Sequence, residues 1–337
     1  MTWIPSAARP WSEGHCRFGN GPGKSQGTRG PGKERGGPGG PGRAAGSAPV
    51  ALPGGSADAA RQSLSYAASM RVALCQVPIS SDPAVNLGRA KAALGDAAAA
   101  GAELAIFPEG TQAHFGSDLR AVAEPTDGAF CTGLAEGARD HGIALVAGVF
   151  EPGPGDRVYN TAVAFDARGD LVAAYRKIHL FDALGQRESD KIAPGDELVI
   201  AEIGGLRIGI LICYDIRFPE HARALVARGA DLVVVPACWA AGLFKEEHWV
   251  TLVRARAIEN TVWVAAADQV PDRSEPPSRA PTGSGRSMLI DPMGVVRLDL
   301  GPRAGVAVGD ADTAVTAEIR ADLPSLRHRR EDVFGRP

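Results

Sequence analysis

The sequence is short of the residue patterns that build metal sites and disulfide frameworks. Its five cysteines are widely spaced among 337 residues, and no two of them form a Cys-x-x-Cys pair. The seven histidines contain no His-Glu-x-x-His motif. An odd number of scattered cysteines fits neither a disulfide framework nor a zinc site. We therefore expect no metal and a reducing, cytoplasmic setting.

Long apolar runs are also missing. No run approaches the roughly 18 residues that a membrane-spanning helix needs, and no signal-peptide core follows Met1. Residues 70–337 carry 28 Lys and Arg against 36 Asp and Glu, a net charge of −8. An acidic surface gives no support to nucleic-acid binding. We expect neither a membrane nor a nucleic acid as partner.

Residues 1–69 lack the apolar side chains of a folded domain. They contain 15 Gly and 8 Pro but only five Leu, Ile, Val or Phe, and their net charge is +5. Such a segment buries too little apolar area to offset the entropy of ordering it. We predict a disordered, solvated extension over 1–69, a natural start at Met70, and one domain over 70–337.

Strand and helix patterns alternate from Met70 onward, which is typical of an α/β domain. Predicted strands lie at 71–78, 103–108, 143–150, 158–166, 171–176, 198–203, 206–213, 231–236, 261–267, 285–290 and 294–300. Predicted helices lie at 86–101, 128–142, 219–228 and 245–259. Turn residues at 167–170 and 291–294 indicate hairpins, which add antiparallel pairs. Mixed sheets of this kind favour a layered sandwich over one doubly wound sheet.

Three predicted strands end in residues that could perform chemistry: Glu109, Lys177 and Cys213. Each alone has an ordinary interpretation, as a loop carboxylate, a surface lysine or a buried thiol. Together a carboxylate base, an ammonium and a thiol nucleophile suffice for acyl transfer. A Cys–His protease is a weaker interpretation, because neither His179 nor His221 lies in a recognisable motif.

Cys213 lies where a strand turns towards the helix predicted from Pro219. The positive end of a helix favours a thiolate, so we expect a lowered pKa for this thiol. Cys75, Cys131 and Cys238 are expected to be small buried hydrophobic side chains.

The segments around these three residues resemble the signature blocks of the carbon–nitrogen hydrolase (nitrilase) superfamily. The blocks are Phe-Pro-Glu at 107–109, Tyr-Arg-Lys-Ile-His-Leu at 175–180 and Ile-Cys-Tyr-Asp-Ile-Arg-Phe-Pro-Glu at 212–220. Supporting matches follow the family's order at 158–162, 187–190, 247–249, 254–260 and 327–330. Within the family, the sequence is most similar to the amidase branches that include omega-amidase and deaminated-glutathione amidase.

The resemblance implies an α-β-β-α sandwich with mixed sheets, paired across subunits into a homodimer or higher homo-oligomer. It implies that Glu109 is the general base, Lys177 the oxyanion stabiliser and Cys213 the nucleophile. Glu188 matches the family's second glutamate, which positions substrate and orders the lysine, and the Tyr214 N–H matches the other oxyanion donor. No organic cofactor is implied.

Family resemblance also suggests that His114, Phe115, Trp239 and His248 shape the substrate pocket. Trp239 and Trp249 are equally compatible with places in the core or at a subunit interface. The loops at 110–116 and 180–188 depart from omega-amidase and border the pocket in this family. A further set, expected to form an ion-pair network rather than to bind substrate, comprises Asp215, Arg217, Glu220, Arg254 and Glu259.

The implied activity is hydrolysis of a small linear amide to a carboxylic acid and ammonia through a thioester. Nitrile hydrolysis, N-carbamoyl hydrolysis and N-acyl transfer on the same residues are alternatives. A non-catalytic ligand-binding role is a further alternative, against which the presence of all four catalytic residues argues. The sequence does not identify the substrate.

Overall fold

The computed structural model describes residues 69–275 and 280–335. The extension predicted over 1–69 therefore lies, apart from Ser69, outside the described residues. The described part of the chain contains two β-sheets.

The first sheet has seven strands, and its parallel centre is flanked by antiparallel pairs. Its strands, in spatial order, are β13 (Gly305–Asp312), β1 (Ser69–Gln76), β2 (Leu104–Ile106), β3 (Ala144–Pro152), β4 (Val158–Phe165) and β5 (Leu171–Arg176), with β6 (Ile192–Ala193) paired to β4. The antiparallel pairing of β4 with β5 confirms the first predicted hairpin.

The second sheet has six strands and the same plan, with parallel β8, β9 and β10 at its centre. Its strands, in spatial order, are β12 (Val296–Asp299), β11 (Met288–Ile290), β10 (Trp263–Asp268), β9 (Leu232–Ala237), β8 (Leu206–Ile210) and β7 (Ile200–Ile203). The pairing of β11 with β12 confirms the second predicted hairpin.

The helices begin and end with recognisable signals. They are α2 (Pro83–Ala99), α3 (Leu119–Val122), α4 (Ala129–His141), α5 (Pro219–Ala227), α6 (Lys245–Asn260), α7 (Thr313–Asp322), α8 (Glu331–Phe334) and the 3₁₀ turns η1 (Glu188–Asp190) and η2 (Cys213–Arg217). Asp82 caps α2 by accepting the Ala84 N–H at 2.8 Å, and Pro83 occupies the first helical position. Gly142 ends α4 in the left-handed conformation, with φ of +63°.

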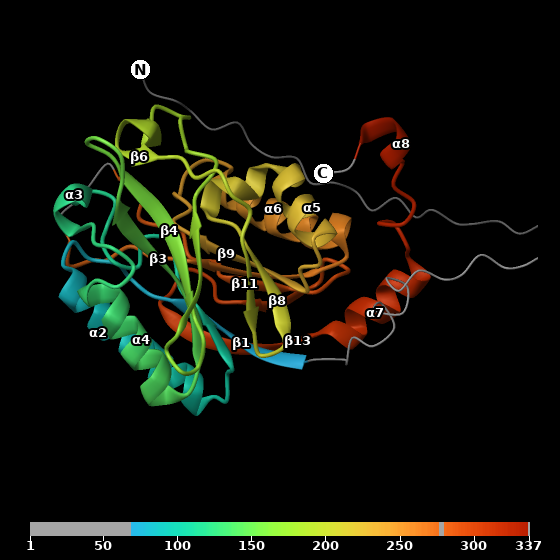
Figure 1. Cartoon of the computed structure of the whole chain (residues 1–337), viewed down its shortest axis with the longest axis horizontal. Coiled ribbons are helices and arrows are strands. Elements are labelled where there is room, and N and C mark those ends of the chain that lie inside the picture. Colours follow the sequence, from blue (N-terminus) through green and yellow to red (C-terminus); the bar gives the residue numbers. More distant parts are fainter. Residues whose placement is uncertain (1–68, 276–279, 336–337) are drawn as a thin grey trace, which may run out of the picture. The chain divides into compact units, whose positions relative to one another are not determined.

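The layers are helix, sheet, sheet, helix. Side chains of β1 alternate between the two faces of the first sheet: Val72 and Leu74 pack towards the second sheet, whereas Ala73 and Cys75 pack against α2 and α4. Helices α5 and α6 cover the outer face of the second sheet, so the two helix pairs lie on opposite sides of the sheets (Figure 1). The predicted α-β-β-α sandwich with mixed sheets is confirmed.

The sequence did not predict β13, the two-residue β6, the helices α3, α7 and α8, or the 3₁₀ turns η1 and η2. Most of the other strands are apolar and buried, whereas β13 is mostly half-buried and contains Gly305 and Gly309. Its strand conformation depends on pairing along the whole of β1, from Ser69 opposite Asp312 to Gln76 opposite Gly305. The predicted strand 206–213 is also too long, because β8 ends at Ile210 and Cys213 begins the turn η2.

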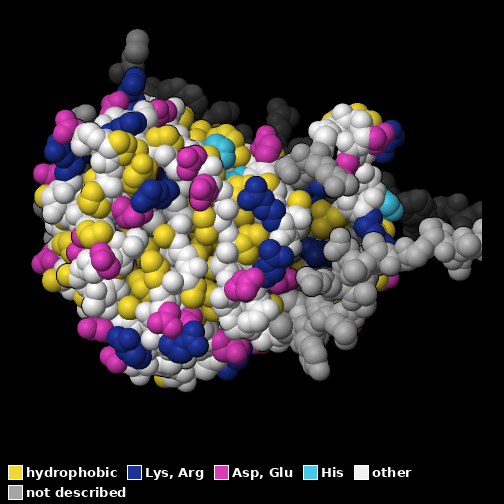
Figure 2. Space-filling model, viewed as in Figure 1, with side chains coloured by type: hydrophobic (Ala, Val, Ile, Leu, Met, Phe, Trp, Pro, Cys, Tyr) yellow, Lys and Arg dark blue, Asp and Glu magenta, His cyan; other side chains and the backbone are white. Residues whose placement is uncertain are grey.

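None of the helices within the described residues is both long and apolar enough to cross a membrane. On the face shown in Figure 2, acidic and basic side chains are interspersed over the folded part of the chain.

Candidate active site

The predicted catalytic residues come together where strands of both sheets end. Glu109 follows β2, Lys177 follows β5 directly, and Cys213 follows β8. All three line one cavity of about 350 Å³, together with Glu188 from η1. Strand ends are rigid mounts for loop residues, which is why α/β folds place their sites there.

Glu109 is held by backbone contacts to both sheets. Its N–H donates to the Ala237 carbonyl at the end of β9, at 3.3 Å. The next turn rests on β3 at Gly148, where a Cβ atom would stand 2.3 Å from the Gly110 nitrogen. Only glycine permits this approach, and it lets the Gly148 N–H donate to the Pro108 carbonyl. The Glu109 carboxylate is thus fixed by its backbone.

Lys177 lies between two carboxylates and is 2% exposed. Its Nζ donates to Glu109 Oε1 at 2.8 Å and to both Glu188 oxygens at 2.9 Å. Burial opposes the lysine charge, but Glu109 and Glu188 outweigh that effect and hold the pKa of Lys177 well above its usual value. The ammonium therefore stays protonated.

Asn160 and Cys238 complete the shell around Glu109. Asn160 Nδ2 donates to Glu109 Oε1 at 2.7 Å and lies 3.3 Å from Glu188 Oε1. The Cys238 N–H donates to Glu109 Oε2 at 2.9 Å. Both oxygens of Glu109 are thus occupied by donors that orient the carboxylate.

Cys213 has a left-handed backbone, with φ of +45°. For a residue with a Cβ atom this conformation is strained and persists only where the surroundings fix it. The first hydrogen bond of η2 runs from the Asp215 N–H to the Ile212 carbonyl, so the Tyr214 N–H precedes it. An N–H in this position is one of the unpaired donors at the start of a helical turn.

The resting form of Cys213 differs from the one that we expected. Burial and the neighbouring Glu109 charge raise the pKa of the Cys213 thiol well above its usual value, although Lys177 acts in the opposite direction. The predicted lowering by the helix end is therefore wrong, because burial and the carboxylate prevail over it. The thiol keeps its proton until a base removes it, and Glu109 lines the same cavity.

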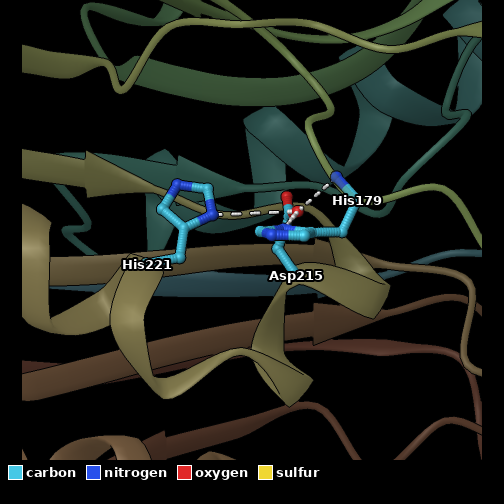
Figure 3. A group of neighbouring side chains, drawn as sticks. All are labelled: His179, Asp215 and His221. Carbon is cyan, nitrogen blue, oxygen red and sulfur yellow. Dashed lines mark hydrogen bonds and ion pairs between the residues drawn. The ribbon is translucent and has the colours of Figure 1, made fainter.

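Asp215 anchors the turn that carries Cys213 to the end of β5. Its Oδ2 accepts the Ile212 N–H at 2.9 Å and the Tyr175 hydroxyl at 2.6 Å. Its Oδ1 accepts the His179 N–H at 3.0 Å and lies 2.7 Å from His179 Nδ1 (Figure 3). Burial disfavours the charge, but the histidines and the Tyr175 hydroxyl hold the pKa of Asp215 well below its usual range.

Among the described residues, one group of His and acidic side chains is compact enough to share a metal ion: His179, Asp215 and His221. Figure 3 shows the Asp215 carboxylate between the two imidazole rings. His221 Nδ1 is 3.7 Å from Asp215 Oδ1, beyond hydrogen-bond distance. Four protein donors already occupy the Asp215 carboxylate, whereas neither ring nitrogen of the buried His221 has a hydrogen-bond partner among the described residues.

The expected pocket residues divide into two sets. Phe115, Tyr214 and Trp239 line the cavity. His114 does not, because it is buried and its Nδ1 accepts the Gly116 N–H at 2.9 Å. His248 is exposed and lies 3.5 Å from an Arg217 nitrogen, also outside the cavity lining. Both loops expected to border the pocket contribute to it, through 115–116 and through Phe181 and 186–188.

The predicted ion-pair network is wrong. Within the described ranges, none of its five members pairs with another member. Asp215 binds His179 and Tyr175, Arg254 donates to the Gly294 carbonyl, and Glu259 pairs with Arg256. Trp249 is fully buried in the core and its ring lies 5.3 Å from that of Trp239.

Asp268 and Lys245 are site residues that the sequence did not reveal. Asp268 is buried and accepts the Trp239 N–H at 2.7 Å and the Ser284 N–H at 2.8 Å, which fixes the cavity wall. Lys245, the first residue of α6, lines the cavity directly. Neither residue lies in one of the quoted blocks, and a lone aspartate or lysine gives no signal of its own.

The chain is similar in sequence to several proteins over most of its length. The carbon-nitrogen hydrolase family model matches residues 71–321. A hydrolase of Mycobacterium tuberculosis strain H37Rv is 41% identical over 271 residues, which cover 78% of this chain and 97% of the relative. Omega-amidase NIT2 of Danio rerio is 34% identical over 275 residues, covering 79% and 96%.

Solved structures agree with these relatives. The Saccharomyces cerevisiae protein Nit3, a member of branch 10 of the nitrilase superfamily, superposes with a TM-score of 0.69 at 28% identity, covering 78% of this chain and 97% of Nit3. A variant of the amidase from Nesterenkonia sp. AN1, with the acetamide moiety of fluoroacetamide covalently added at its active-site cysteine, gives a TM-score of 0.67 at 30% identity and covers 79% and 95%.

These matches confirm the family that the signature blocks indicated. The family match runs from β1 into α7, and the solved structures share the fold. The chain belongs to the carbon–nitrogen hydrolase family and is a hydrolase of carbon–nitrogen bonds other than peptide bonds.

Proposed function

We propose that the protein hydrolyses a small linear amide to a carboxylic acid and ammonia through a thioester on Cys213. The observation that carries this proposal is the buried Glu109–Lys177–Glu188 cluster, which lines one cavity with a strained Cys213. A protonated thiol beside a fixed carboxylate suits base-assisted attack on a carbonyl group.

In the first half of the reaction, Glu109 takes the Cys213 thiol proton as Sγ attacks the amide carbonyl carbon. The carbonyl oxygen becomes an oxyanion, held by Lys177 Nζ and the Tyr214 N–H. The C–N bond then breaks, the nitrogen takes the proton from Glu109, and ammonia leaves. The acyl group remains on Sγ as a thioester.

In the second half, Glu109 takes a proton from water as the water oxygen attacks the thioester carbonyl. The C–S bond breaks, the Cys213 sulfur regains the proton from Glu109, and the acid departs. Lys177 stabilises both oxyanions. In the resting site, Lys177 Nζ donates all of its hydrogen bonds to carboxylates. One of these N–H groups must therefore leave its carboxylate to donate to the oxyanion, while Glu188 holds the ammonium in place.

Water alone is the second reactant in this scheme, and no step needs a redox or metal group. Nitriles and N-carbamoyl compounds also present an electrophilic carbon to a thiol and are the alternatives. The covalent acetamide adduct on the Nesterenkonia amidase cysteine supports the amide among these substrates.

Ammonia release from short amides, nitriles and ureido acids, measured side by side, tests the reaction class. Cys213→Ala should release no detectable ammonia, and Lys177→Ala should lose roughly 10²–10³ in rate, the usual effect of one missing oxyanion donor. Cys131→Ala is the matched control, because Cys131 is buried in the core between α4 and the first sheet. Acid-quenched wild-type enzyme should show an acyl adduct on Cys213 by mass spectrometry.

Turnover by Cys213→Ala at the wild-type rate would contradict the mechanism. If ammonia is released from nitriles but not from amides, the substrate is a nitrile and not an amide. We propose further that the enzyme acts in the cytoplasm as a homodimer or higher homo-oligomer on a small-molecule amide. The composition supports the first point and the family resemblance the second.

A further inference from the structure

A second cluster of polar side chains lies outside the lining of the catalytic cavity. It consists of His179, Asp215 and His221, none of which lines that cavity. His179 follows β5, Asp215 lies in η2 and His221 lies at the start of α5. The side chains of the three residues converge on one another, as Figure 3 shows. The cluster therefore connects the end of β5 to η2 and α5.

His221 is the member of this cluster whose polar atoms are not satisfied. Its side chain is 2% exposed, and neither ring nitrogen has a hydrogen-bond partner among the described residues. The ring packs edge-on against Tyr175, and its Nδ1 lies 3.7 Å from Asp215 Oδ1. A neutral imidazole has one N–H donor and one lone pair, so burial without partners is unfavourable. The Nδ1 atom is therefore directed at the carboxylate from beyond hydrogen-bond distance.

The charge of Asp215 has no Lys or Arg partner within 69–275 or 280–335. Its ion-pair partners in these ranges are the two histidines. Its other donors, the Tyr175 hydroxyl and the Ile212 N–H, are neutral. Buried carboxylates are ordinarily paired with a cation or bound to a metal ion. The described part of the cluster thus combines a buried negative charge with an imidazole nitrogen that has no partner.

The spacing of the three side chains fits a tetrahedral metal ion. Their ligand atoms all lie within 4.8 Å of one another. In a tetrahedral zinc site with bonds of about 2.0–2.1 Å, neighbouring ligand atoms are about 3.3 Å apart. Asp215 Oδ1 lies 2.7 Å from His179 Nδ1 and 3.7 Å from His221 Nδ1, so each separation is within about 0.6 Å of that value.

An ion at this position displaces a single hydrogen bond. Zinc on Asp215 Oδ1 takes the place of the His179 Nδ1–H donor, and His179 then carries its proton on Nε2. The His179 backbone N–H keeps its bond to Oδ1, and the Tyr175 hydroxyl and Ile212 N–H keep theirs to Oδ2. The His179 side chain is 28% exposed, so an ion and a water molecule as its fourth ligand can enter from this side.

We propose that His179, Asp215 and His221 bind one zinc ion, which fastens the end of β5 to η2 and α5. Imidazole nitrogens together with a carboxylate oxygen are typical zinc ligands, whereas Mg²⁺ and Ca²⁺ prefer oxygen ligands. The ion takes no part in the reaction, because its ligands do not line the cavity. It stabilises the segments that carry Lys177 and Cys213, and its binding does not depend on which substrate the enzyme hydrolyses.

Zinc binding to full-length Cys213→Ala tests the site, because this variant lacks the nucleophilic thiol as a competing ligand. Calorimetry should show a zinc site that does not bind magnesium. Adding His221→Leu, which places an apolar side chain at this buried position, should weaken zinc binding at least about tenfold. Adding His179→Gln, at the more exposed ligand, should have the same effect. His141→Gln, at the exposed end of α4, is the control and should leave zinc binding unchanged.

Thermal melting and cobalt spectra give two further measurements. Zinc at about 100 times its Kd should raise the Tm of Cys213→Ala by about 5 °C and should raise that of the variant with His221→Leu much less. Cobalt in place of zinc should give the visible absorption of a tetrahedral site of nitrogen and oxygen ligands, without a thiolate band from Cys238. If His221→Leu does not fold, His179→Gln and the cobalt spectrum decide. Equal zinc affinity with and without the histidine ligands, or a thiolate band, would overturn the site.

Discussion

In the proposed mechanism one buried carboxylate has two effects on Cys213. Glu109 removes the Cys213 proton, yet its charge also raises the pKa of that thiol. The resting cysteine is therefore a protonated thiol, which is less reactive towards oxidants than a thiolate.

Glu109→Gln should therefore change two reactions in opposite directions. Amide hydrolysis should fall by about 10²–10⁴, because general-base catalysis is lost. Alkylation of Cys213 by a small neutral reagent should become faster at a given pH near neutrality, because removing the negative charge lowers the thiol pKa. Ammonia release and peptide-level mass spectrometry measure the two rates. Glu136→Gln, an exposed site, serves as control.

A fall in both rates would contradict this account, since it would mean that Glu109 favours the thiolate. The pH dependence gives a second check. Alkylation of the wild-type thiol should continue to rise above the ordinary thiol pKa of about 8.5, with no plateau below it.

At the level of single residues, the sequence identified candidate residues but not their surroundings. Glu109, Lys177 and Cys213 were identifiable because each places a reactive group at the end of a predicted strand. Asn160 and Lys245 gave no such signal, since their importance comes from what the fold places opposite them. His248 is the opposite case. It lies in one of the family's sequence blocks, but in the structure it is exposed and does not line the cavity.

At the level of elements, the site depends on the joint between the end of β5 and the turn η2. Asp215 makes this joint because its carboxylate accepts hydrogen bonds from both segments. The Tyr175 hydroxyl and the His179 N–H come from the segment of Lys177, and the Ile212 N–H comes from the segment of Cys213. His179 is further fixed by stacking on Phe218, with ring centroids 3.7 Å apart. Lys177 and Cys213 are thus positioned through one buried carboxylate.

Asp215→Asn should weaken both the fold and catalysis. At pH 7 the free energy of unfolding should fall by about 3–5 kcal/mol, the usual effect of breaking a buried, hydrogen-bonded charge. Because its pKa is lowered in the folded state, the carboxylate stabilises fully above its ordinary pKa of about 3.9 and loses that contribution as pH falls further. The difference from wild type, measured by urea unfolding, should therefore shrink below about pH 4.

The kinetic signature of this positioning role separates it from plain destabilisation. In the folded fraction kcat should fall while KM stays near its wild-type value, because Asp215 does not line the cavity. Asp170→Asn, in an exposed turn, should change neither quantity. A pH-independent stability difference, or an unchanged kcat, would be evidence against the joint.

The layered fold could be predicted from alternation and turn residues, but the edges of its sheets could not. Strands β2, β8 and β9 are apolar enough to be recognised alone. β13 becomes a strand through its pairing with β1, whereas the apolar run of β1 itself is recognisable from the sequence without that partner. Local sequence therefore specifies the parallel centres, whereas long-range pairing specifies the margins.

At the scale of the whole molecule, the two sheets meet across a shared core. Val72 and Leu74 of β1 pack in the same cluster as Val234 and Val264 of the second sheet. The cavity lies where ends of both sheets meet, so a shift of one sheet against the other would separate Glu109 from Cys213. Activity should therefore be lost together with the fold in a single transition.

The boundary of this domain leads to the last prediction. Met70 is buried within β1 and pairs opposite Ala311, so the folded unit needs the chain from that residue onward. A protein that starts at Met70 should match the full chain in kcat/KM and melt within about 2 °C of it, because all described core contacts are kept. A protein that starts at Val77 lacks β1, which separates β13 from β2, and should fail to fold. Amide hydrolysis and thermal melting of the three proteins measure this, and a clear loss of activity on starting at Met70 would show that residues 1–69 contribute to the enzyme.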